Sequence, residues 1–152
     1  MEKEKVFRPV AFNSSSYIGS LYYLFTFLCA GSYNPYLYVY IADLGISGKQ
    51  IGLLASLVPV SMLVFAAPIA SLADVKSWRV RILRLGLLGW AVSLFFLQFP
   101  NTFAQFVMVL LPLAVLNSPV MAIADGLIAR MAKRENLNYG GMRLWGSFGF
   151  AT

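Results

Sequence analysis

Asp125 and Arg143 are the two side chains whose types and spacing best suit binding chemistry. Within an apolar helix, a carboxylate usually faces a cavity or a charged partner, because burying it alone is costly. An arginine offers a fork of donors that suits carboxylates and polyhydroxylated solutes. The two residues stand 18 positions apart, and a short connection between two helices would bring them side by side. We therefore predict an Asp125–Arg143 pair.

Two helical faces extend this polar pattern. Small residues share the face of Asp125 at spacings of three and four, which permits close helix packing or lines a cavity: Ala114, Ser118, Ala122 and Ala129. An earlier segment carries a polar and aromatic face: Tyr22, Thr26, Cys29, Tyr33, Tyr36 and Tyr40. This face is either part of a binding surface or a belt of interfacial tyrosines. We expect Tyr33 and the adjacent Asn34 to contact a substrate.

The remaining chemistry is limited by composition. The chain has no histidine and one cysteine, Cys29, so it has neither an internal disulfide nor a His- or Cys-ligated metal site. No phosphate loop, nucleophile–base arrangement or metal-ligand spacing appears. We therefore expect no enzymatic activity, no metal and no cofactor. Any proton transfer would have to use carboxylates.

The elements that hold these residues are predicted to be membrane-spanning helices. Hydrophobic residues make up 59% of the chain and charged residues only 12%, whereas a soluble domain has about 25% charged residues. A span needs about 20 mostly apolar residues and must bond its own backbone. We predict four spans and the start of a fifth, in an all-α membrane protein: residues 17–41, 51–72, 82–99, 103–132 and 142–152.

The placement of basic residues predicts the orientation. Of the twelve Lys and Arg residues, all but Lys49 lie in the tail, residues 1–16, or flank the second and fourth connections. The positive-inside rule then places the tail and these connections in the cytoplasm. This distribution explains the net charge of +6 without nucleic acid. The same distribution of charge leaves two alternatives open. Asp125 would pair with Arg130 or Arg134, and Arg143 would be only a basic residue that flanks the fifth span on its cytoplasmic side.

Four stretches resemble the major facilitator superfamily. The loop after the second span, with Leu72, Asp74 and Arg79, is similar to the family's G-x-L-x-D-R-x-G-R-R signature, with Ser77 in place of its second Gly. Three further stretches are similar to the branch of the lactose permease, the nucleoside:proton symporters and the phenylpropionate permease: Gly31–Tyr36 (GSYNPY), Leu44–Leu54 (LGISGKQIGLL) and Tyr139–Phe150 (YGGMRLWGSFGF).

The resemblance implies roles for particular residues. In lactose-permease-type proteins, a carboxylate of the fourth span and an arginine of the fifth bind the sugar, and Asp125 and Arg143 stand at those positions. Phe150 replaces the tryptophan that stacks on the sugar seven residues after the arginine. Asp74, with Arg79 and Arg81, would belong to a cytoplasmic gate between moving halves.

These observations favour a secondary transporter over two alternatives. We expect proton-coupled symport of a small polar solute, such as a sugar, a nucleoside or an aromatic acid, by a multi-pass protein of the cytoplasmic membrane. Because the fifth span stops at Thr152, we also expect a fragment whose C-terminal half is missing. The alternatives are a non-transporting membrane protein, such as a truncated product, subunit or scaffold, and a drug/proton efflux transporter.

Overall fold

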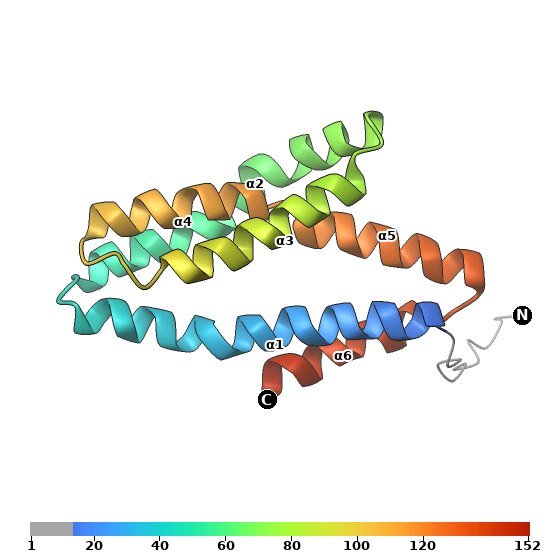
Figure 1. Ribbon diagram of the computed structural model, residues 1–152, viewed down its shortest axis with the longest axis horizontal. Coiled ribbons are helices and arrows are strands. Elements are labelled where there is room, and N and C mark those ends of the chain that lie inside the picture. Colours follow the sequence, from blue (N-terminus) through green and yellow to red (C-terminus); the bar gives the residue numbers. More distant parts are fainter. Residues whose placement is uncertain (1–13) are drawn as a thin grey trace, which may run out of the picture. The chain divides into compact units, whose positions relative to one another are not determined.

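The computed structural model describes residues 14–152, and these residues form six α-helices joined by short turns (Figure 1). The predicted all-α class is confirmed. The helices are α1 (Ser14–Asp43), α2 (Gly48–Val75), α3 (Arg79–Phe96), α4 (Phe103–Asn117), α5 (Val120–Glu135) and α6 (Tyr139–Ala151). Most of the predicted tail, residues 1–13, lies outside the described part of the chain. Its last residues, Ser14 to Ser16, begin α1 rather than preceding it.

The apolar stretch 103–132 is two helices rather than the single one predicted. The helix is interrupted at Ser118 and Pro119, between α4 and α5. Proline has no N–H to donate to the carbonyl four residues earlier, that of Val115. The Ser118 hydroxyl donates to that carbonyl instead, at 2.8 Å. The substitute bond explains how the chain tolerates the break among apolar residues.

The chain divides into two compact units, one of which combines both ends of the described chain. This first unit holds α1 as far as Leu37 and the segment Leu127–Thr152, which contains the end of α5 and all of α6. Tyr23, Ile128, Ala132 and Met142 form its buried cluster.

Glycines of α6 allow the close packing of α1 and α6 inside this unit. A Cβ added at Gly149 would lie 2.3 Å from the Leu24 carbonyl oxygen, closer than real Cβ contacts allow. The two backbones can therefore touch only because a small residue occupies this position.

The second unit, Tyr38–Gly126, is built around α4. This helix packs against both α2 and α3. It buries Phe106, Leu110, Leu113 and Ala114, whose spacings of three and four residues form one stripe. Within residues 14–152, two stretches, Gly48–Val75 and Phe103–Glu135, are long and apolar enough to cross a membrane. The other predicted spans stay predictions.

Candidate functional site

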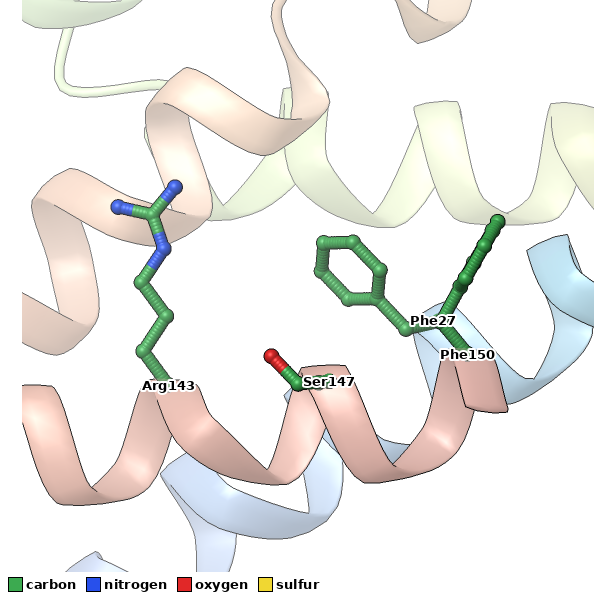
Figure 2. A pocket seen from close by; sticks show the side chains of 5 residues that line it. Phe27, Arg143, Ser147 and Phe150 are labelled. Atoms are coloured by element: carbon green, nitrogen blue, oxygen red, sulfur yellow. The ribbon is translucent and has the colours of Figure 1, made fainter. Parts of the chain in front are cut away.

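A pocket of about 400 Å³ opens along α6, within the first unit. It is lined by Phe27 of α1 and by Arg143, Gly146, Ser147 and Phe150 of α6. The α6 residues recur at spacings of three and four, so they share one face of the helix. Figure 2 shows the Arg143 guanidinium at one end of this row, the Ser147 hydroxyl in the middle, and the rings of Phe27 and Phe150 at the other end.

The ring of Phe27 enters the pocket because α6 has a glycine opposite it. A Cβ on Gly146 would lie 2.9 Å from Cδ2 of Phe27. Any larger residue at this position would push the ring away or separate the helices. The apolar end of the pocket therefore depends on Gly146 as much as on the two phenylalanines.

Arg143 is oriented from within its own helix. One of its terminal nitrogens, Nη1, donates to the Tyr139 hydroxyl at 3.4 Å. The Tyr23 hydroxyl of α1 donates to the same oxygen at 3.2 Å. Tyr23 is fully buried and its ring meets that of Tyr139 edge-on. A cation with several donors thus stands at one end of the pocket, beside two hydroxyls.

The structure brings together some of the predicted substrate residues. Arg143 and Phe150 line one pocket. Tyr33 and Asn34 lie in the same unit, half-buried on α1, but they are not among the residues that line it. Asp125 is half-buried on α5 and belongs to the other unit. The Asp125–Arg143 pair therefore stays a prediction.

The small residues predicted to share the face of Asp125 differ in their burial. Ala114 and Ser118 are buried, but Ala122 and Ala129 are exposed. Ser118 keeps right-handed helical angles, with a φ of −51° and a ψ of −42°, and its N–H donates to the Ala114 carbonyl at 3.0 Å, so the shared face stays a prediction.

The predicted gate residues occupy the turn between α2 and α3. Arg79, the first residue of α3, donates to the Asp74 carboxylate in an ion pair. This hydrogen bond raises the pKa of Arg79 above its ordinary value. Arg81 is exposed on the following turn. The Lys76 ammonium also lies over the Trp78 ring, 4.7 Å from its centroid.

The turn at the C-terminal end of α2 contains one residue in the left-handed backbone conformation. Ser77 has a φ of 54°, and its N–H donates to the Asp74 carbonyl at 3.3 Å. The next N–H, that of Trp78, donates to the Ala73 carbonyl at 2.8 Å. These two bonds define a Schellman cap, whose left-handed position usually holds glycine. Ser77 stands at the place of the second glycine in the loop signature, and glycine would adopt this backbone angle without strain.

Sequence reasoning missed four residues of the arrangement around Arg143. Phe27 and Ser147 line the pocket, and Tyr139 and Tyr23 hold the arginine. The spacing of four residues between Tyr139 and Arg143 was a usable signal. No sequence signal pointed to Phe27, because an aromatic residue in an apolar helix cannot be distinguished from one that only packs against neighbouring helices. Across residues 14–152, no three His, Cys, Asp or Glu side chains gather in a way that could hold a metal ion.

Comparison with known proteins gives a consistent result. The family described as "MFS_1 like family" matches residues 18–152. An uncharacterized transporter of Bacillus subtilis (strain 168), YwbF, is 33% identical over 137 residues, which cover 86% of this chain and 33% of that protein. A maltose permease of Geobacillus stearothermophilus is 30% identical over 132 residues, covering 86% of this chain and 34% of the permease. The chain thus spans about a third of the length of these relatives. No solved structure matches it.

Proposed function

The chain belongs to the MFS_1-like family of transporters, and from this premise we propose that it supplies the first helices of a secondary transporter. The transporter would carry a small polar solute across the cell membrane by alternating access, with a further half completing the pathway. The family and the names of both relatives support a transporter rather than an enzyme. Proton-coupled symport is the mode we propose.

The observation that carries this proposal is the pocket along α6. A guanidinium at one end offers several donors in a planar fork, which suits the hydroxyls of a sugar or a carboxylate. Two aromatic rings at the other end offer flat apolar surfaces. A solute with a polar edge and a flat apolar face fits both ends, as sugars, nucleosides and aromatic acids do. The maltose permease among the relatives favours a sugar.

We also propose roles for the remaining predicted site residues. Asp125 would pair with Arg143 or bind the solute when the complete protein closes around it, and Tyr33 and Asn34 would extend the polar lining along α1. Asp74, Arg79 and Arg81 would form the cytoplasmic gate. The Asp74–Arg79 ion pair supports this role, because a pair confined to one exposed turn can be exchanged for other partners at little cost.

Membrane insertion is supported by the apolar surface of α2. Residues in the middle of this helix are exposed, among them Leu63 with 85% of its surface accessible, Val64 and Phe65. Contiguous apolar surface of this kind requires lipid or another helix to cover it. We propose that the N-terminus is cytoplasmic, because the basic residues cluster in the tail and the even-numbered connections.

Transport by the complete reading frame in proteoliposomes tests this function. We expect uptake of maltose, uridine or 3-phenylpropionate, driven by an inwardly directed proton gradient. Arg143→Ala should raise the KM of the transported solute by about 10- to 100-fold, because a charged hydrogen-bonding group is lost. Arg84→Ala, at an exposed arginine of α3 that is not among the residues lining the pocket, is the matched control and should stay near the wild-type value.

Two results would overturn the proposal. Uptake of none of the three solutes would contradict the proposed substrate class. Wild-type uptake and binding in both Asp125→Asn and Arg143→Ala would show that the substrate site lies elsewhere.

A further inference from the structure

The hydroxyls of Tyr23 and Tyr139 form a row that ends on the guanidinium of Arg143. The Tyr139 oxygen lies 3.4 Å from Nη1 of Arg143 and 3.2 Å from the Tyr23 oxygen. A phenol oxygen has two acceptor sites, so it can receive both bonds at once. The row starts in the buried cluster of the first unit and ends at the pocket.

Tyr23 and Tyr139 are both held in place more firmly than the Arg143 side chain. Tyr23 is fully buried, and its ring centroid lies 6.4 Å from that of Tyr139 at an interplanar angle of 75°. Tyr139 is the first residue of α6, and this turn is capped by the Asn138 side chain, which accepts from the Gly141 N–H at 3.1 Å. Arg143, in contrast, is an exposed side chain with many rotamers. A rigid partner therefore reduces the number of directions in which the guanidinium can point.

We propose that Tyr139 is a positioning residue, which, supported by Tyr23, holds the Arg143 guanidinium toward the pocket before solute binds. The proposal rests on the proposed function in so far as the pocket binds the transported solute. Fixing a long side chain in its binding orientation improves affinity, since the cost of ordering it is not incurred on binding. The bond from Tyr139 is uncharged on the acceptor side, so it orients the guanidinium without neutralising it.

The chemical test measures how accessible Arg143 is to phenylglyoxal, which attacks guanidinium groups. The complete protein is solubilised in detergent, treated with phenylglyoxal and mapped by peptide mass spectrometry, with Arg79, Arg81 and Arg84 as internal references. We expect Tyr139→Phe to raise the modification rate of Arg143 several-fold. Tyr23→Phe should produce a smaller increase, because it removes only the support of Tyr139. Tyr36→Phe is the matched control, since it removes a hydroxyl from an α1 tyrosine that is 72% exposed.

The transport test separates positioning from simple stabilisation. Tyr139→Phe should raise the KM for maltose about five- to tenfold, as expected for a lost hydrogen bond to a charged group. The maximal rate should change by less than about twofold, because orientation before binding affects affinity first.

The ring of phenylalanine keeps the packing of the buried cluster. The temperature of unfolding should therefore fall by a similar amount in Tyr23→Phe and Tyr139→Phe.

The modification rate of Arg143 and the transport kinetics distinguish failure of the positioning role from failure of the proposed function. An unchanged Arg143 modification rate in Tyr139→Phe overturns the positioning role, whatever the protein transports. A changed unfolding temperature with unchanged modification and KM would also overturn it, because the tyrosine would then be merely structural. A raised modification rate in a protein that takes up none of the tested solutes would support the positioning role and contradict the proposed function.

Discussion

Arg79 and Arg143 both stand near the start of a helix, yet they are held by partners of different charge. Arg79 donates to a carboxylate, Asp74, within one exposed turn. Arg143 donates to a phenol, Tyr139, beside a pocket. A carboxylate neutralises the guanidinium that it holds, whereas a phenol only orients it. The difference is that the bond to Asp74 joins opposite charges, whereas the bond to Tyr139 directs the guanidinium through a neutral acceptor.

The surroundings of the two arginines differ in the same sense. The turn of Arg79 is closed by backbone bonds and an exposed ion pair, so few side chains depend on it. The pocket of Arg143 depends on the close approach of two helices at Gly146 and Gly149. We therefore expect substitutions in the pocket region to have larger consequences than substitutions in the turn.

Among the variants proposed, Gly149→Ala should lower the stability of the protein the most. The added Cβ of Gly149→Ala would lie 2.3 Å from the Leu24 carbonyl oxygen, so α1 and α6 would have to separate. We expect a loss of about 1–3 kcal/mol, typical of overpacking. Thermal unfolding of the complete protein in detergent measures it. Gly52→Ala in α2 is the control, because nothing lies within 4 Å of its Cβ, and it should be neutral or slightly stabilising. Equal stability of the two variants would contradict close packing of α1 and α6.

Lysine in place of each arginine tests the comparison directly. Lysine is a point charge without a planar fork, so it can replace a guanidinium in an ion pair better than in multidentate binding. We expect Arg143→Lys to raise the KM of uptake about tenfold, or about 1.4 kcal/mol. Arg79→Lys should change it by less than about twofold. Similar losses in both variants would show that the two arginines have equivalent roles.

The sequence was sufficient to predict the helices and two of the residues that line the pocket. Apolar stretches of about 20 residues predict helices whatever their neighbours. The resemblance implied substrate roles for Arg143 and Phe150, and both residues line the pocket. Pro119 is one of several prolines that could interrupt a span, so the sequence pointed to a kink there but did not show that α4 would end at Asn117 while the other prolines of the predicted spans stay inside helices. The contribution of Phe27 could not be predicted either, since its place in the pocket depends on the glycine opposite it, Gly146.

The two turns that carry left-handed residues allow the smallest and sharpest test. Ser77 after α2 and Asn136 after α5 both have a φ of 54°, and each is followed by an N–H that donates five residues back, to Ala73 and Ala132. The turn between α2 and α3 and the turn between α5 and α6 thus share a left-handed residue and the backbone bond that follows it.

The side chains in these two turns should nevertheless respond differently to glycine. Asparagine tolerates the left-handed region better than serine, so the strain is greater at Ser77. We expect Ser77→Gly to stabilise the protein by about 0.5–1 kcal/mol, and Asn136→Gly by less than about half as much. Unfolding temperatures of the two variants, compared in the same detergent, measure the difference. An equal or larger gain at Asn136 would show that the turn between α2 and α3 is not the more strained of the two.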